Sequence, residues 1–328
     1  MLNASIVGWG TAIPHHRLTN ADLEARLDTN DTWIVERTGI RERRIADPSE
    51  TTGSLAIAAA SEAIKSAGLT PADIDLMIVA TATPDQPIPH TGAFVGDALG
   101  MQCGSFDLNA ACAGFVYELV IGASMVHGGL EHVLIVGSET LSRVCDPEDR
   151  TTVVLFGDGA GAAVLARREN AGGVLGFDLG CDGSAAGLLE IRAGGSRLPT
   201  SEQTLADREQ YLKMAGQQVF KRAVRAVVDS ATLTLDRSGV DAADVAWFVP
   251  HQANGRIIDA AAQRLGFEPE RTLQNIDRYG NTSSASIPLA LFEAVDDGRV
   301  KEGDLVLCAG FGAGMTWASA LMEWQPGA

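Results

Sequence analysis

Apolar positions recur along the chain in two spacings that predict alternating helices and strands. Residues 54–69 read SLAIAAASEAIKSAGL, an alanine-rich amphipathic helix, and a Thr-Pro turn separates them from the apolar strand IDLMIVATA. The segment GFVYELVIGASMVHGG ends in glycines as a helix does, and the buried strand HVLIVGSE follows it. This alternation predicts an α/β fold with a largely parallel sheet.

The same succession of segments occurs twice. ADIDLMIVATA begins at residue 72 and ADVAWFVPHQA begins at residue 243, each after a long amphipathic helix. After each come a Leu-Gly pair, a small-residue stretch that opens a helix, a buried strand and a glycine-rich turn into another apolar strand. We interpret the chain as a tandem duplication of an N-terminal half, 1–170, and a C-terminal half, 171–328, which meet near residues 168–174.

Composition narrows the class of protein. Hydrophobic residues make up 46% of the 328 residues and charged residues 20%, which is typical of a soluble globular protein without a membrane span or a secretory signal. The five cysteines are scattered and include no C-x-x-C pair, so we expect a reducing compartment, the cytoplasm. A net charge of −17 argues against nucleic-acid binding, and no histidine spacing indicates a metal site.

Four arginines nevertheless crowd the segment WIVERTGIRERRI: Arg37, Arg41, Arg43 and Arg44. Because Glu36 and Glu42 lie among them, the segment is compatible with a solvated, self-paired face. It is equally compatible with a binding site for phosphate groups, which arginine pairs with well. Sequence spacing leaves both interpretations open.

Candidate chemistry centres on the heptapeptide NAACAGF, residues 109–115, in which Cys112 stands among alanines at the expected start of a helix. Small neighbours leave a sulfur open to a ligand, and a helix N-terminus lowers the pKa of a thiol. The alternative is an ordinary buried cysteine. In the second half His251 ends a strand and Asn281 opens a helix, although either could be a satisfied core or capping residue.

The glycine-rich segment GDGAGA, residues 157–162, superficially suggests a dinucleotide-binding loop. It leads into AAVLA, which is a strand pattern, whereas a dinucleotide-binding loop must lead into a helix. We therefore reject an NAD-dependent reductase and expect these glycines to allow close backbone packing.

Taken together, Cys112 in NAACAGF, His251 in VPHQAN and Asn281 in RYGNTSSAS resemble the Cys-His-Asn triad of the beta-ketoacyl-ACP synthase III family, the initiating condensing enzymes of thiolase fold. The resemblance covers nearly the whole chain and includes NDTWIVERTGIRERRI, CDPEDRTTVVLFGDGAGAAVLA, LKMAGQQVFKRAV and FGAGMTW. It implies two duplicated α/β halves that form a five-layered αβαβα sandwich.

The resemblance also implies an acyltransferase activity. Cys112 would take an acyl group from acyl-CoA, and malonyl-ACP would then lose CO₂ and attack the thioester, giving 3-ketoacyl-ACP at the start of fatty-acid synthesis. His251 and Asn281 would stabilise the enolate oxygen, and the backbone N–H groups of Cys112 and Ala313 would form a second oxyanion hole. No cofactor or metal is implied beyond the two substrates.

Binding residues follow from the same resemblance. Trp33, Arg37 and Arg150 match positions that clasp CoA, while Lys221 and Arg256 match positions that receive the acidic carrier protein. The acyl pocket would be lined by a set of apolar residues: Leu141, Phe156, Met214, Phe311 and Ile88, the last lent by the partner subunit of a homodimer.

Two departures from the family pattern are Tyr279, where relatives often have histidine, and Ala313, which replaces a glycine and puts the flexibility of that turn in doubt. Neither removes a triad member. Two alternatives remain: a priming or acyl-transferring enzyme of a polyketide-type route, and a non-catalytic acyl-CoA or carrier-protein binding module. The intact triad argues against the second alternative, whereas no residue decides the starter or the pathway.

Overall fold

A five-stranded mixed sheet forms the core of the first half of the chain. The computed structural model describes residues 2–167 and 172–326, so most of the predicted junction between the halves lies outside the described residues. The sheet has the order β1-β7-β6-β4-β5, with bounds Ala4–Ala12, Asp158–Arg167, His132–Thr140, Leu76–Ala80 and Gly104–Leu108. Strand β4 runs parallel to β5 and β6, whereas β7 runs antiparallel to both β6 and β1.

The second half builds a sheet with the same pattern of directions. Its order is β11-β12-β13-β8, with bounds Trp247–Pro250, Leu305–Gly312, Thr316–Glu323 and Gly173–Cys181. Strand β11 runs parallel to β12, and β13 runs antiparallel to β12 and β8. The counterpart of β5 is reduced to one parallel bridge between Phe248 and Thr272.

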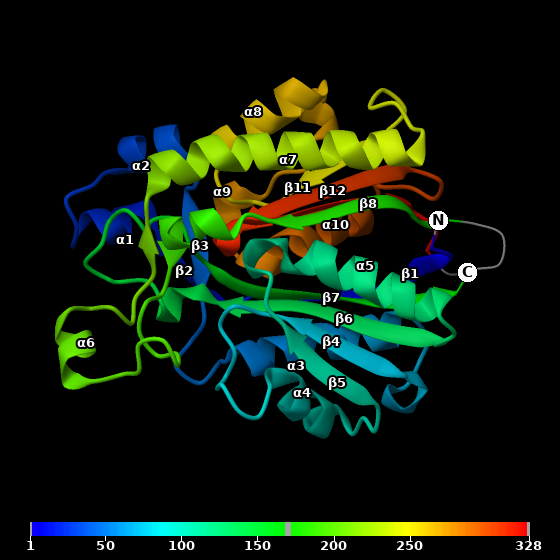
Figure 1. The fold of residues 1–328 in the computed structure, drawn as a ribbon, viewed down its shortest axis with the longest axis horizontal. Helices are drawn as coiled ribbons and strands as arrows, with labels where there is room; N and C mark the ends of the chain where they lie inside the picture. The colour runs from blue at the N-terminus through cyan, green and yellow to red at the C-terminus, as the bar shows by residue number, and fades with distance from the viewer. Residues whose placement is uncertain (1, 168–171, 327–328) are drawn as a thin grey trace.

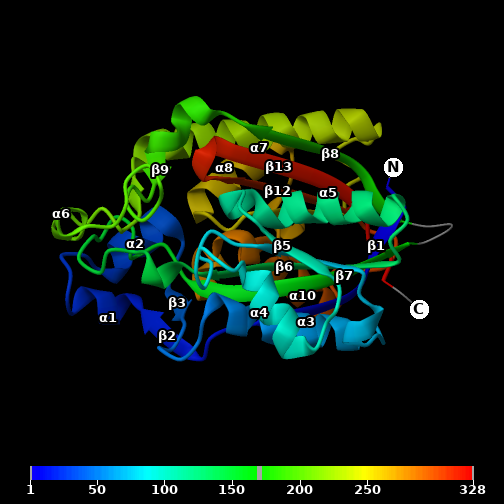
Figure 2. The same cartoon turned by 60° about the horizontal axis from the view of Figure 1, so that its bottom comes forward.

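Helices cover both sheets and fill the space between them (Figure 1). Helices α3 (Thr52–Ser66) and α4 (Thr91–Leu99) lie outside the first sheet, and α7 (Gly216–Ser238) and α8 (Gly255–Leu265) lie outside the second. Helices α5 (Gly114–His127) and α10 (Ser286–Asp296) lie between the sheets, since each contacts strands of both, and the turned view in Figure 2 shows α5 there. The predicted five-layered αβαβα arrangement is confirmed.

Shorter elements gather at one end of the sandwich, on the left of Figure 1. The hairpin strands β2 (His16–Thr19) and β3 (Glu42–Ile45) pair there. Near them lie the remaining elements: α1 (Asn20–Glu24), α2 (Asp31–Thr38), α6 (Glu202–Ala206), β9 (Leu189–Glu190), β10 (Lys213–Met214) and α9 (Ile276–Tyr279). Within the described ranges, no helix has the length and apolar character needed to cross a membrane.

Burial explains why the two central helices differ in composition from the outer ones. Helix α5 contacts both sheets, and its residues Phe115, Val116 and Leu119 are almost completely buried. Helix α7 buries one face only and keeps charged residues on the other, as expected for a helix on the outside of a sandwich. The extent of the apolar surface therefore distinguishes the central helix α5 from the outer helix α7.

Two short 3-10 turns start the central helices and pack against each other: η2 (Ala111–Ala113) before α5 and η6 (Ser283–Ala285) before α10. They have matching backbones, because Ala111 and Ser283 both have positive φ, 48° and 50°. Glycines allow the close approach: a Cβ on Gly137 would lie 2.6 Å from the carbonyl oxygen of Ser284. The packing of η6 on β6 thus requires a residue without a side chain at position 137.

We predict that Gly137→Ala destabilises the protein by about 1–3 kcal/mol, the usual cost of overpacking a close-packed interior. Its methyl group has no room beside the Ser284 carbonyl, so β6 and η6 must separate. The matched control is Gly183→Ala, because a Cβ at Gly183 meets no atom within 4 Å. Denaturant unfolding measures both variants, and equal stability of the two would contradict the packing argument.

Candidate active site

The predicted nucleophile lies in the central layer, in the turn η2 that packs against β12 of the second sheet. Cys112 is the middle residue of η2, and α5 begins two residues later at Gly114. The side chain is 8% exposed and faces a cavity, with alanines on both sides of it in the chain. The prediction of a thiol at a helix start among small residues is confirmed.

The pKa of the Cys112 thiol differs from the expectation. Burial raises the pKa of the Cys112 thiol to about 12, although the Ser283 side chain lowers it; the Glu139 carboxylate adds a smaller increase, and the backbone at the helix start lowers it least. Burial therefore outweighs the lowering that was expected from the helix N-terminus. The unliganded thiol is protonated at neutral pH, and acylation must remove its proton.

His251 directly follows β11, and its backbone N–H donates to the carbonyl of Ala309 at 2.8 Å. Its ring is held on two sides: Nδ1 lies 2.6 Å from the Ser286 hydroxyl oxygen, and Phe311 packs against the ring at 5.7 Å between centroids. The other nitrogen, Nε2, is buried without a hydrogen-bond partner. Burial lowers the pKa of His251 to about 3, so the imidazole is neutral over the physiological range.

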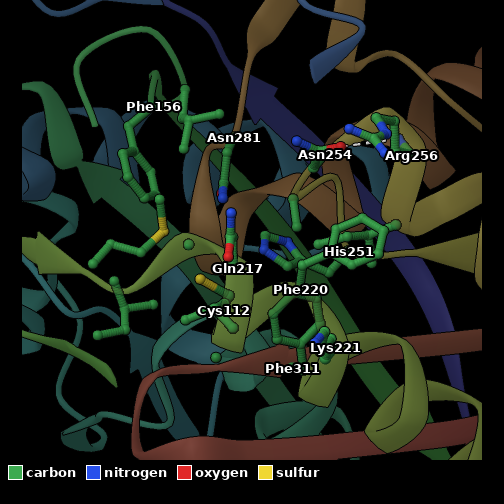
Figure 3. Close-up of a pocket in the computed structure, with 18 of the residues that line it drawn as sticks. Cys112, Phe156, Gln217, Phe220, Lys221, His251, Asn254, Arg256, Asn281 and Phe311 are labelled. Atoms are coloured by element: carbon green, nitrogen blue, oxygen red, sulfur yellow. Dashed lines mark hydrogen bonds between the residues drawn. The ribbon is translucent and has the colours of Figure 1, made fainter. Parts of the chain in front are cut away.

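Asn281 is fixed by its backbone and by its side-chain oxygen. The backbone N–H donates to Leu155 O at 2.8 Å, and the carbonyl accepts from Gly157 N at 2.9 Å. The side-chain Oδ1 accepts from the backbone N–H of Ser283 at 2.9 Å. With Oδ1 engaged there, the amide nitrogen points into the cavity toward Cys112 and His251 (Figure 3).

One cavity of about 460 Å³ brings the three predicted residues together, although they are separated by as many as 169 positions in the sequence, 281 minus 112. Phe156, Met214 and Phe311 line this cavity as predicted for the acyl pocket. Leu141 is buried in the neighbouring apolar cluster that includes Phe156, and it does not line the cavity. Ile88 is 85% exposed on a loop, and its side chain does not line this cavity.

Backbone donors lie beside the thiol. The two predicted donors are the backbone N–H groups of Cys112, in η2, and of Ala313, the residue that follows β12. A Cβ on Gly312 would lie 2.5 Å from the nitrogen of Cys112, so the glycine keeps that nitrogen accessible. The turn takes its positive φ at Gly314, 128°, and Ala313 has no positive φ, so the alanine imposes no strain there.

Basic residues surround the entrance. Trp33 and Arg37 lie one helical turn apart on α2, with the Arg37 guanidinium 4.6 Å from the indole centroid, and Arg150 approaches the same indole at 5.3 Å. Arg37 also lines the cavity, together with Lys221 of α7 and Arg256 of α8. Arg37 therefore connects Trp33 and Arg150 to the cavity that Lys221 and Arg256 also line.

Two other arginines of the basic segment, Arg43 and Arg44, lie in different environments. Arg43 is completely buried and donates to Leu18 O, Asn20 Oδ1 and Val154 O, so it holds the fold together and meets no phosphate. Burial lowers its pKa to about 10. Arg44 donates to Pro14 O and lies 5.6 Å from the ring of Tyr279, the residue that departs from the family pattern.

All of the segment GDGAGA except Gly157 lies in β7, which confirms that it leads into a strand and is not a dinucleotide loop. Asp158 within it is fully buried and accepts from Ala46 N, Ser142 N and the Ser142 hydroxyl. Over residues 2–167 and 172–326, no group of three His, Cys, Asp or Glu side chains is arranged to hold a metal ion.

Sequence reasoning missed several residues of the cavity wall: Leu155, Leu189, Gln217, Phe220 and Asn254. Asn254 could have been predicted from the sequence, because it completes the HQAN motif. Its amide donates to the carbonyl of Arg37, and its Oδ1 caps α8. Gln217 is the second residue of α7 and points toward Asn281 and Cys112 in Figure 3. No local pattern marks Gln217, since its position depends on where α7 begins.

Comparisons with known proteins agree with this geometry. The family described as 3-oxoacyl-[acyl-carrier-protein] synthase III matches residues 106–183, and its C-terminal region matches residues 235–324. The chain is 48% identical to the beta-ketoacyl-[acyl-carrier-protein] synthase III of Natranaerobius thermophilus, over 99% of this chain and 100% of that protein. The corresponding enzyme structure from Aquifex aeolicus has a TM-score of 0.91 at 42% identity, over 98% of this chain and 100% of that one.

A third relative comes from another route. The priming beta-ketosynthase of the R1128 polyketide pathway has a TM-score of 0.91 at 39% identity, over 99% of this chain and 97% of that one. The predicted thiolase-like fold is therefore confirmed by neighbours of nearly the same length.

We predict that the His251 imidazole does not titrate between pH 5 and 8, because burial lowers its pKa to about 3. In the unfolded chain the ordinary histidine pKa is about 6.5, so acidification below that value protonates the unfolded state only and lowers stability. The side-chain ¹⁵N signals of His251, assigned with His251→Asn, measure this against a denatured sample. A titration midpoint between pH 6 and 7 in the folded protein would contradict it.

Proposed function

Because the chain belongs to the 3-oxoacyl-[acyl-carrier-protein] synthase III family, we propose that it condenses an acyl-CoA starter with malonyl-ACP to give 3-ketoacyl-ACP, CO₂ and CoA. The observation that carries the proposal is the convergence of Cys112, His251 and Asn281 in one cavity. These residues are a nucleophile and two donors, which is what the two half-reactions require.

Acylation comes first. The Cys112 sulfur attacks the carbonyl carbon of the acyl-CoA thioester, and the carbonyl oxygen becomes negatively charged in the tetrahedral intermediate. The backbone N–H groups of Cys112 and Ala313 stabilise that oxygen. The C–S bond to CoA then breaks, and CoA leaves as a thiol with the proton that Cys112 has lost.

Condensation follows in the same cavity. Malonyl-ACP loses CO₂, and the electron pair of the broken C–C bond forms an enolate. N–H donors from the neutral His251 ring and the Asn281 amide stabilise the enolate oxygen. The enolate carbon attacks the acyl group on Cys112. The Cys112 thiolate leaves and takes up a proton to become a thiol again. A buried neutral pair of donors suits this step, because decarboxylation supplies the carbanion and no strong base is needed.

The basic residues at and beside the cavity bind the two substrates in this proposal. We assign CoA to Trp33, Arg37 and Arg150, since an indole and guanidinium groups stack on adenine and pair with phosphates. We assign the acidic carrier protein to the exposed cations Lys221 and Arg256. On a chain of net charge −17, a local positive rim steers an acidic partner to the opening. The two half-reactions require no cofactor or metal ion.

A second copy of the chain completes the acyl pocket in this proposal. Strand β5 is the edge of its sheet, and apolar side chains are exposed beside it: Ile88, Phe94 and Phe106. An exposed apolar edge strand is a template for pairing with another chain. Pairing of β5 with its equivalent in a homodimer would cover this surface and bring Ile88 to the neighbour's cavity.

Fatty-acid initiation is the pathway we favour, because the Natranaerobius and Aquifex relatives are beta-ketoacyl-ACP synthases III. The R1128 priming ketosynthase supports a second candidate, in which the same chemistry primes polyketide synthesis. The five cysteines are all free thiols, which fits work on thioesters in a reducing cytoplasm.

We expect incubation with one member of an acyl-CoA panel, from acetyl to dodecanoyl and with branched chains, to add one acyl group to the protein. Intact-protein mass measures the gain, and Cys112→Ala removes the sulfur that carries it. An adduct that persists in Cys112→Ala would place acylation elsewhere. The absence of any adduct with wild-type protein would favour a binding module.

Charge reversal at the entrance tests the carrier-protein assignment. We expect Arg256→Glu to raise the KM for malonyl-ACP on the order of tenfold at low salt, with an unchanged rate of acylation by acyl-CoA. The matched control is Arg225→Glu, an exposed arginine on α7 that does not line the cavity. Equal effects of the two substitutions would show that only overall charge matters.

A further inference from the structure

The hydroxyl of Ser286 is in direct contact with the ring of His251, and the mechanism above has not used it. Ser286 starts α10 and is 1% exposed. Its oxygen lies 2.6 Å from Nδ1 of His251 and accepts the backbone N–H of Gln252 at 3.3 Å. These two contacts are the hydrogen bonds of this hydroxyl within the described residues.

The number of available hydrogens decides which atom donates in the 2.6 Å contact between the Ser286 hydroxyl oxygen and His251 Nδ1. A serine hydroxyl has one hydrogen to donate, and in the described part of the chain His251 Nδ1 is the acceptor within reach of it. If Nδ1 carried the ring proton instead, the serine oxygen would face two N–H donors, and both its own hydrogen and the Nε2 lone pair would lack a partner among the described residues. The Nε2–H tautomer leaves one group unpaired, the Nε2–H of a ring that lines the cavity. Because each unsatisfied buried group is costly, the hydroxyl donates to Nδ1.

We propose that Ser286 is the positioning residue that fixes His251 as the Nε2–H tautomer, which makes the ring a donor toward the enolate oxygen. With Nδ1 occupied as an acceptor, the single hydrogen of the neutral imidazole is on Nε2. That nitrogen is the unpartnered one, and the ring that carries it lines the cavity with Cys112 and Asn281. The opposite tautomer would present a lone pair to a developing negative charge and would repel it.

The first half of the chain supports a dedicated role for this pair. There the corresponding strand end and helix start are Ala80 and Gly114, and a Cβ on Gly114 would lie 3.0 Å from the Ala80 Cβ. The fold therefore brings these two positions together in both halves. Only the second half places a histidine and a serine there, whereas in the first half neither side chain is polar.

This inference rests on the proposed condensation, but its test separates the two. We expect ¹⁵N spectra of wild-type protein to show His251 with a protonated Nε2 and an unprotonated Nδ1, and Ser286→Ala to lose this preference. In Ser286→Ala the kcat of condensation should fall about 10- to 100-fold, as when a group that orients a catalytic ligand is removed. KM and the rate of Cys112 acylation should change little, and Ser286→Thr should restore the tautomer.

The matched control is Ser284→Ala. Ser284 is equally buried on the same segment but donates to Ala80 O and contacts Glu139, so its loss should leave the His251 tautomer unchanged. A wild-type His251 protonated on Nδ1 would overturn the proposal, as would a Ser286→Ala variant that keeps the Nε2–H tautomer and full condensation rate. Wild-type protein that shows this tautomer but forms no product would instead refute the proposed function.

Discussion

The close approach of two helix-start turns is the constraint on which the site depends. Turns η2 and η6 meet between the sheets, and they fit only because glycines face them: Gly137 against the Ser284 carbonyl and Gly312 against the Cys112 nitrogen. Protein interiors are close-packed, so one extra methyl group at such a contact must move backbone. This contact brings Cys112 from one half next to His251 and Asn281 from the other.

Burial that results from this packing sets the charge state of the site. The thiol of Cys112 and the imidazole of His251 are both surrounded by protein, which raises the pKa of the first and lowers the pKa of the second. Both groups are neutral at rest. The site therefore works through directed N–H donors rather than through a standing ion pair, which suits reactions whose negative charge appears only on an oxygen of the substrate.

The two halves share the backbone conformation of the turn before the central helix but differ in its side chains. Asn109 and Asn281 are at equivalent places, and each accepts the N–H of the residue two positions later, at 3.1 and 2.9 Å. Three residues after each asparagine the halves diverge, with Cys112 in the first and Ser284 in the second. The same turn thus carries the proposed nucleophile in one half, and in the other it anchors Asn281 and packs beneath the site.

The sequence by itself determined the order of helices and strands, because hydrophobic periodicity is a local property, and its resemblance to a known family predicted Cys112, His251 and Asn281 as site residues. It also excluded a dinucleotide loop at GDGAGA, since strand and helix patterns differ over a few residues. Only the tertiary structure decided that Arg43 is a buried structural residue, that Cys112 rests as a thiol and that Ser286 contacts His251. Burial and long-range contacts depend on residues far apart in the chain, and no local pattern encodes them.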